Sequence, residues 1–155
     1  MRILILFLLL LSSAVLRAQQ PPTSAYRFSY TIDTLSGRPG YLRVRFRLHN
    51  GSDSVLHFLR RSCSFAHGLH WNVKQWQHRP RVVCRASFPV IDTVAPRGTY
   101  EWTTYFEWVR RAPMPEFTYT LSRLKTPEKP RTISGAERLP AVDTIALREP
   151  VPERP

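Results

Sequence analysis

Hydrophobic and polar side chains alternate at every position through residues 42–49, and this pattern constrains the fold more than any other in the chain. The hydrophobic positions are Leu42, Val44, Phe46 and Leu48, and the basic positions between them are Arg43, Arg45, Arg47 and His49. Successive side chains of a β-strand point to opposite faces, whereas a helix repeats about every 3.6 residues. The alternation therefore predicts a half-buried strand with a hydrophobic inner face and a basic outer face.

The same two-residue period, or a short hydrophobic run, recurs along the chain. We expect strands over residues 26–32, 42–48, 55–59, 69–73, 88–94, 100–108, 117–121 and 141–147, with a short additional strand at 82–84. Helical periodicity does not persist in any of these segments. The residues that share a face in the most aromatic strand are Tyr100, Trp102, Thr104, Phe106 and Trp108. A stripe of this kind is typical of a core rather than of a platform for a ligand.

Glycine, proline and asparagine separate the expected strands. Residues 36–40, 95–98 and 113–115 carry turn signals, and residues 125–135 are polar enough to form a loop. Asn50-Gly51 predicts a hairpin that pairs strand 42–48 with strand 55–59. About seven short strands, with turn signals every 8 to 12 residues or so, predict an all-β chain that folds as a single antiparallel immunoglobulin-like β-sandwich.

The two ends of the chain differ in composition from this domain. Arg2 is followed by a hydrophobic run from Ile3 to Leu11 and a small residue at Ala18, which is typical of a secretory signal peptide. The rival interpretation, a membrane anchor, requires about 20 hydrophobic residues. We therefore expect a signal peptide at 1–18, a flexible lead-in at 19–24, the sandwich at 25–147 and a proline-rich tail at 148–155. The expected protein is secreted or periplasmic, without an integral membrane span.

The chain is strongly basic, with 23 Lys and Arg against 11 Asp and Glu and a formal net charge of +12. Removal of Arg2 and Arg17 with the signal peptide leaves 21 against 11, or +10. A surface of this charge attracts polyanions, although it also serves simply to keep a protein soluble. The alternating residues Arg43, Arg45 and Arg47 are the possible anion-binding residues, since they project to one side of their strand.

Cys63 and Cys84 are the only cysteines, and an exported protein with two cysteines is expected to join them in one disulfide. Closing a loop of about 20 residues would stabilise the fold by roughly 3 kcal/mol. The alternative is a zinc site made by both cysteines with His67 and His70. Structural zinc sites usually use closely spaced cysteine pairs, so we expect the disulfide and no metal or other cofactor.

Catalytic motifs are absent from the sequence. It contains no G-x-S-x-G elbow, no H-E-x-x-H pair and no glycine-rich phosphate loop, and the disulfide would remove the thiolate that a cysteine nucleophile needs. We therefore expect a binding module that is not an enzyme, with a partner that is an envelope protein or an anionic polymer rather than a specific nucleic acid.

The alternative function is that of a secreted protease inhibitor. Its possible binding loop is Ser64, Phe65, Ala66, His67 and Gly68, next to Cys63.

Several short motifs resemble those of a group of small exported bacterial proteins. These motifs are the run from Leu48 to Val55, the element Ser62-Cys63-Ser64-Phe65, the second cysteine at Cys84 and the turn from Val94 to Gly98. Together they cover roughly residues 43–106. The resemblance implies an immunoglobulin-like β-sandwich, and it implies no activity.

Overall fold

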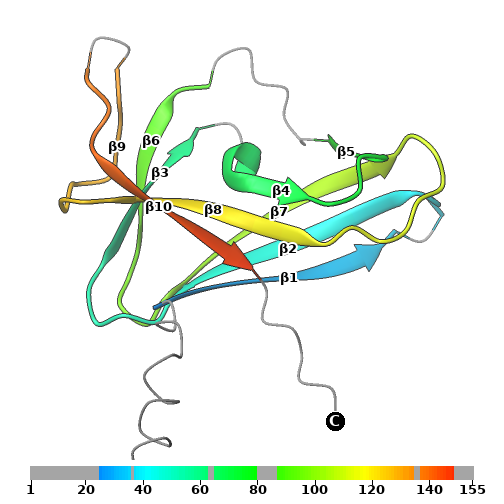
Figure 1. The fold of residues 1–155 in the computed structure, drawn as a ribbon, viewed down its shortest axis with the longest axis horizontal. Helices are drawn as coiled ribbons and strands as arrows, with labels where there is room; N and C mark the ends of the chain where they lie inside the picture. Colours follow the sequence, from blue (N-terminus) through cyan, green and yellow to red (C-terminus); the bar gives the residue numbers. More distant parts are fainter. Residues whose placement is uncertain (1–24, 36, 63–64, 80–86, 135–136, 149–155) are drawn as a thin grey trace, which may run out of the picture.

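The chain forms two antiparallel β-sheets that pack face to face, as the computed structural model in Figure 1 shows. The structure describes residues 25–35, 37–62, 65–79, 87–134 and 137–148. One sheet has the strand order β1-β2-β7-β5. Its strands are β1 (Tyr26–Thr34), β2 (Tyr41–Asn50), β7 (Thr99–Trp108) and β5 (Trp76–Arg79). The all-β class predicted from the alternation is confirmed.

The second sheet has the strand order β10-β8-β3-β6-β9, and β4 pairs with β8 as well. Its strands are β10 (Val142–Arg148), β8 (Phe117–Leu124), β3 (Leu56–Arg61), β6 (Pro89–Val94), β9 (Arg131–Thr132) and β4 (Leu69–Trp71). A single turn of 3-10 helix, η1 (Phe65–Gly68), precedes β4. Within the described residues, no helix has the length and hydrophobicity that crossing a bilayer requires.

The core lies between the two sheets and is dominated by aromatic rings. Phe46 is fully buried, and its ring centroid lies 5.3 Å from that of Trp102 and 5.1 Å from that of Phe117. Phe106 packs against Phe117 as well, at 5.0 Å. The inner face predicted for residues 42–48 and the core role predicted for the aromatic stripe are both confirmed. Ring pairs in such arrangements add stabilisation beyond the hydrophobic area that they bury.

A partly buried polar contact joins the two sheets at one side of this core. Asp92 of β6 accepts hydrogen bonds from Arg60 Nε at 2.8 Å and from the Tyr100 hydroxyl at 2.9 Å. Burial raises the pKa of Asp92, but the hydrogen bonds from Arg60, Tyr100 and the Thr93 amide outweigh it and leave the pKa below its ordinary value. Burial and the hydrogen bond to Asp92 raise the pKa of Tyr100 to about 12. Asp92 is therefore held as a carboxylate and Tyr100 as a neutral phenol.

The predicted hairpin at Asn50-Gly51 is wrong. β2 pairs with β1 and β7, and β3 belongs to the other sheet. The reason is the side chain of Asn50, which is buried and bonds to backbone carbonyls of the two connections that cross between the sheets. Asn50-Gly51 therefore begins a crossing connection, in which residues 51–55 carry the chain from one sheet to the other.

Three shorter segments also differ from the expectation. The segment predicted as a loop at 64–68 contains η1, and the loop at 125–135 contains the two-residue strand β9. The strand predicted at 69–73 ends at Trp71, because a turn in which the Trp76 amide donates to the Val73 carbonyl reverses the chain into β5. β5 was not predicted, since four residues are too few to establish an alternation. The expected strand at 82–84 lies outside the described residues.

A histidine in the inner face of β5 should make the fold sensitive to mild acid. His78 Nε2 lies 2.7 Å from Thr104 Oγ1, and burial lowers the pKa of His78 below its ordinary 6.5. The unfolded chain therefore binds a proton at a higher pH than the folded protein does. The stability that neutral His78 contributes is present above pH 6.5 and is lost as the pH falls below it.

We expect the free energy of unfolding, measured by urea titration, to decrease as the pH is lowered from 7.5 towards 5. Protonation of His78 in the unfolded chain should cause the part of the decrease that begins near pH 6.5. The variant His78→Gln, which has no proton to gain, should lose part of this decrease. His49→Gln, on the outer face of β2, is the control. Identical pH dependence in the wild-type protein and His78→Gln would contradict this prediction.

Candidate functional site

The arginines predicted as a possible anion site lie on the outer face of β2. Arg43, Arg45 and Arg47 are all exposed, as the alternation predicts. However, Arg43 is paired with Asp33 of β1 at 2.9 Å, and Arg47 is paired with Glu101 of β7 at 2.6 Å. We call this outer surface of β1, β2 and β7 the arginine face.

Two of the three guanidinium groups on the arginine face are thus already neutralised by a neighbouring strand. Arg45 lies opposite Thr31 and Thr103 in the register, and no carboxylate of the described residues pairs with it. Exposed ion pairs contribute only about 0 to 1 kcal/mol, but a bound polyanion would have to compete with both carboxylates. The structure therefore brings the three arginines together without leaving three free cations, and their anion-binding role stays a prediction.

A more enclosed candidate is a hollow on the outer face of the second sheet. Its volume is about 230 Å³. It lies at the point along β8 where the paired strand changes from β3 to β4. Leu59 of β3 pairs with Ser122, and Leu69 of β4 pairs with Tyr119. The lining residues are Leu59, Arg60, His67, Gly68, His70, Tyr119, Thr120, Ser122 and Thr144. We call this feature the β8 hollow.

Local chain geometry explains why the β8 hollow is closed on one side. β3 and β4 are consecutive neighbours of β8, and the chain between them must leave the sheet and return. It returns through η1, which approaches β8 so closely that a side chain at Gly68 would collide with the Thr120 carbonyl oxygen. Only glycine allows this approach. Gly68 thus places η1 as a wall over the outer face of β8.

The side chains of the β8 hollow offer hydroxyl and imidazole groups. Thr120 and Ser122 of β8 and Thr144 of β10 contribute hydroxyls, and His70 Nε2 lies 3.0 Å from Thr120 Oγ1. The second imidazole, of His67, belongs to an exposed residue of η1. None of the lining residues is an aspartate or glutamate. Such a set can donate hydrogen bonds to an oxygen-rich or anionic group without charge repulsion.

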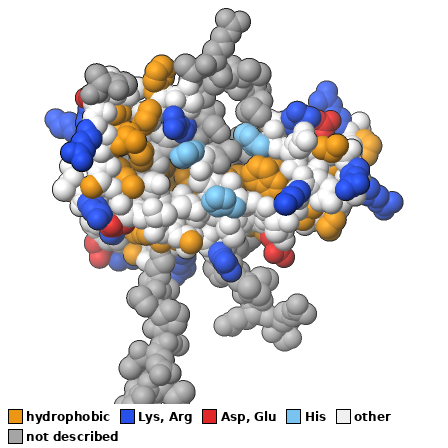
Figure 2. Space-filling model, turned by 45° about the horizontal axis from the view of Figure 1, so that its top comes forward, with side chains coloured by type: hydrophobic (Ala, Val, Ile, Leu, Met, Phe, Trp, Pro, Cys, Tyr) orange, Lys and Arg blue, Asp and Glu red, His pale blue; other side chains and the backbone are white. Residues whose placement is uncertain are grey.

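The β8 hollow includes part of the loop that the sequence marked as a possible binding loop. His67 and Gly68 line the hollow, Phe65 and Ala66 begin η1, and Ser64 lies outside the described residues. Figure 2 shows a face on which histidine side chains lie between two ends that carry Lys and Arg side chains. His67 was proposed from its place beside Cys63, whereas the hydroxyls of Thr120, Ser122 and Thr144 were missed. These residues belong to two strands that are separate in the sequence, so the sequence alone does not indicate that they line one site.

The disulfide and the alternative zinc site depend on residues beyond the described ones. Cys63 and Cys84 both lie outside the described residues, whereas His67 and His70 line the same hollow. In the described part of the chain, no three histidine, cysteine or carboxylate side chains are grouped as metal ligands would be. Ser62, which precedes Cys63, lies close to Phe88, four residues after Cys84, because the Ser62 amide donates to the Phe88 carbonyl at 2.8 Å.

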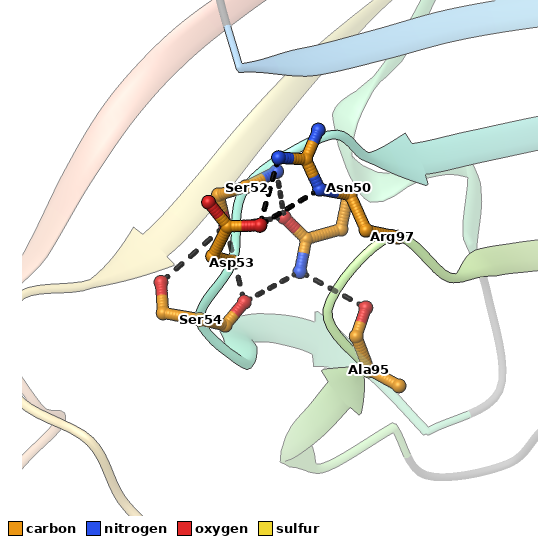
Figure 3. A network of polar contacts seen from close by, with 6 residues as sticks. All are labelled: Asn50, Ser52, Asp53, Ser54, Ala95 and Arg97. Atoms are coloured by element: carbon orange, nitrogen blue, oxygen red, sulfur yellow. Dashed lines mark hydrogen bonds and ion pairs between the residues drawn. The ribbon is translucent and has the colours of Figure 1, made fainter.

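A third polar cluster, drawn in Figure 3, surrounds Asn50 and is structural. The Asn50 side-chain nitrogen donates to the carbonyl oxygens of Ser54 at 2.8 Å, Ala95 at 3.1 Å and Val94 at 3.2 Å. Its side-chain oxygen accepts hydrogen bonds from the Ser52 amide and hydroxyl. We call this cluster the Asn50 junction. Because the nitrogen is buried and occupied, Asn50-Gly51-Ser52 cannot act as a glycosylation acceptor in the folded protein.

Comparison with known proteins finds no relative of this chain. No protein-family model matches the chain, and neither a curated protein nor a solved structure matches it.

Proposed function

We propose that the protein is an exported, non-catalytic binding module that holds an anionic group of a cell-envelope polymer in the β8 hollow. The observation that carries this proposal is the lining of the hollow: the hydroxyls of one serine, two threonines and one tyrosine, two imidazoles and the guanidinium of Arg60, with no carboxylate among the lining residues. The net charge, +12 for the whole chain and +10 without Arg2 and Arg17 of the expected signal peptide, draws polyanions towards the protein as a whole. The hydrogen-bonding groups of the hollow then select the part of the polymer that enters it.

The size of the β8 hollow limits what it can hold. At about 230 Å³ it is smaller than the roughly 300 to 1,000 Å³ of pockets that enclose whole drug-sized ligands. A phosphate, sulfate or carboxylate with its attached sugar ring is a suitable size. The rest of the polymer would remain outside, over the outer side of the edge strand β10.

The contacts of His70 support a role in binding rather than catalysis. A catalytic imidazole that activates a hydroxyl is normally oriented by a third group, usually a carboxylate. His70 contacts the Thr120 hydroxyl, but the lining of the hollow supplies no carboxylate to orient the ring. When Nε2 donates to Thr120 Oγ1 in this contact, the Thr120 hydroxyl keeps its own proton to donate to an anion.

Filling the β8 hollow tests this proposal. Thr144 is exposed on β10 and lines the hollow, so Thr144→Trp should cover it without disturbing the core. Binding of heparin, polyphosphate and polygalacturonate, measured by calorimetry at physiological ionic strength, samples the three anionic groups. We expect Thr144→Trp to weaken binding of at least one of them by about tenfold or more. Thr103→Trp, an equally exposed change on the arginine face, should leave the affinity within about twofold.

Each remaining outcome contradicts the proposal in a different way. If Thr103→Trp weakens binding and Thr144→Trp does not, the arginine face is the site. If both variants weaken binding equally, or if neither changes it, the β8 hollow is not the specific site. If none of the three polymers binds the wild-type protein, the proposed ligand class is wrong.

The finer fold type that we propose is immunoglobulin-like. In that fold one sheet has the order A-B-E-D and the other contains G-F-C, as β1-β2-β7-β5 and β10-β8-β3 do here. The strand order differs from that pattern at β6. This strand follows β5, the D-like strand, in the sequence, but it lies beside the C-like strand β3 in the other sheet. Cys63 and Cys84 stand before and after the segment that contains η1, β4 and β5. The proposed disulfide would close this segment into a covalent loop.

The disulfide makes a direct prediction for intact-mass analysis. The purified protein should be two hydrogen masses lighter than the same protein after reduction. The contact between Ser62 and Phe88 supports this expectation, since it brings the flanking chain segments together. Two thiols that react with an alkylating reagent in the native protein would contradict the disulfide.

The protease-inhibitor alternative remains a prediction without a specific observation in its favour. An inhibitor that fills a protease cleft usually presents an extended segment, whereas Phe65–Gly68 is coiled as a 3-10 turn. Incubation with a panel of secreted proteases is the test. Inhibition by the protein at micromolar concentration would favour this alternative over the binding module.

A further inference from the structure

One end of the sandwich is formed by three connections that are far apart in sequence. They are the described residues of the β1–β2 connection (35 and 37–40), the β4–β5 connection (72–75) and the β7–β8 connection (109–116), and they lie together at the right of Figure 1. We call this end the basic tip. The same end of the molecule, at the right of Figure 2, carries Lys and Arg side chains around hydrophobic ones.

The cations of the basic tip differ from Arg43 and Arg47 of the arginine face in having no acidic partners among the described residues. They are Arg38, Lys74, Arg110 and Arg111, all exposed. Among the described residues, no carboxylate forms an ion pair with any of them, and Arg38 instead lies over the ring of Tyr41. Glu116 is the one acidic residue in the three connections. The three connections of the basic tip therefore carry four cations against one carboxylate, a local excess of positive charge.

Two large hydrophobic side chains are exposed among these cations. Val109 is 66% exposed and Met114 is 54% exposed, although both belong to residue types that are usually buried. Val109 and Arg110 line a shallow recess with Lys74 and Gln75, so hydrophobic and cationic groups share one surface. Exposed hydrophobic groups rimmed by polar ones mark interaction surfaces.

Backbone contacts to the core hold the three connections together. The Val109 amide donates to the Gln75 carbonyl at 2.9 Å, and the Trp108 amide donates to the Gly40 carbonyl at 3.0 Å. Gly40 has a φ of +83°, and a side chain there would collide with the indole of Trp108. The Trp76 indole N–H donates to the Pro113 carbonyl at 2.7 Å. The basic tip is thus a surface that is already formed in the free protein.

We propose that the basic tip docks onto the surface of an anionic lipid bilayer, with Val109 and Met114 entering the headgroup region. A soluble polyanion requires only the cations, whereas a bilayer uses both the cations and the hydrophobic side chains. Cations near an anionic surface and buried hydrophobic area contribute together to such binding. This inference is independent of the β8 hollow, since none of the lining residues of the hollow belongs to the three connections.

Co-sedimentation with vesicles tests the electrostatic part. The purified protein should bind vesicles of phosphatidylcholine with phosphatidylglycerol, and it should bind vesicles of phosphatidylcholine alone at least tenfold more weakly. Changing three tip cations to glutamine, in Lys74→Gln/Arg110→Gln/Arg111→Gln, should lower the partition coefficient at least tenfold. The control variant removes three cations from elsewhere in the chain, as Lys125→Gln/Lys129→Gln/Arg138→Gln, and should lower it by less than about threefold.

The hydrophobic part separates a bilayer from other polyanions. Val109→Ser/Met114→Ser should lower binding to the anionic vesicles at least tenfold and should leave heparin binding unchanged. The control is Val55→Ser/Leu139→Ser, which removes two hydrophobic side chains of similar exposure outside the basic tip and should have little effect on either. Thermal unfolding of each variant confirms that it is folded.

Three results would overturn the proposal. Failure to bind anionic vesicles at low ionic strength would exclude docking on lipid. Unchanged vesicle binding by Val109→Ser/Met114→Ser would show that the hydrophobic side chains do not enter the bilayer. Equal losses in the tip-cation and control-cation variants would show that net charge alone attracts the protein to the vesicles.

Discussion

Replacement of Asn50 by aspartate should lower the free energy of unfolding by about 3 to 5 kcal/mol, although it changes only one side-chain group. The Asn50 nitrogen donates to three carbonyl oxygens, at 2.8, 3.1 and 3.2 Å. A carboxylate oxygen in its place would face all three acceptors without a proton to share, in a fully buried position. Urea titration followed by tryptophan fluorescence measures the loss.

The matched control for this variant is Asn72→Asp. Asn72 is exposed between β4 and β5, and among the described residues its side-chain nitrogen donates only to the exposed Glu116 carboxylate at 3.2 Å. The same chemical change there breaks one solvent-exposed hydrogen bond and should cost about 1 to 2 kcal/mol. A protonated aspartic acid still donates one hydrogen bond, and the loss at position 50 should therefore be smaller at acidic than at alkaline pH. Similar losses at positions 50 and 72 would mean that the Asn50 junction does not hold the two connections together.

Replacement of Phe46 by alanine should also cost about 3 to 5 kcal/mol, in this case through a cavity in the aromatic core. Phe46 is fully buried and packs against Phe28, Trp102 and Phe117, with ring centroids 5.1 to 5.7 Å away. The loss is a large share of the total stability expected for a domain of this size. Denaturant titration measures it directly.

The neighbouring residue on the same strand provides the comparison for Phe46→Ala. Arg45→Ala, on the exposed face and without an acidic partner in the described residues, should change the free energy of unfolding by no more than about 0.5 kcal/mol. Equal losses at Phe46 and Arg45 would place both faces of β2 in buried surroundings. That result would contradict the assignment of one face to the core and the other to solvent.

The strands were predictable because their signal is local. In β2, β7 and β8, hydrophobic residues at every second position leave only one way to bury a face, and Phe46, Trp102 and Tyr119 are buried accordingly. Pairing was less predictable, because it depends on which strands meet in space. Asn50-Gly51 is a typical hairpin signal, yet the buried amide of Asn50 satisfies carbonyls of two connections and directs the chain into the other sheet.

The candidate surfaces were predicted only in part, for the same reason. The alternation was enough to place Arg43, Arg45 and Arg47 on one face, but the acidic partners come from β1 and β7 and could not be assigned without the strand register. The β8 hollow depends on β8 having two successive neighbours, and the basic tip combines three connections. Neither arrangement leaves a motif in any single stretch of sequence.

The enclosed setting of Asn50 also affects how the protein ages chemically. In flexible Asn-Gly sequences, the glycine nitrogen attacks the asparagine side-chain carbonyl, releases ammonia and leaves aspartate or isoaspartate after hydrolysis. Here the Gly51 amide donates to the Ala25 carbonyl at 2.7 Å, and the Asn50 side chain is fixed by its own hydrogen bonds. Deamidation therefore requires local unfolding. Each event would produce a chain like Asn50→Asp that refolds poorly, so accumulated deamidation would record how long the protein had spent open.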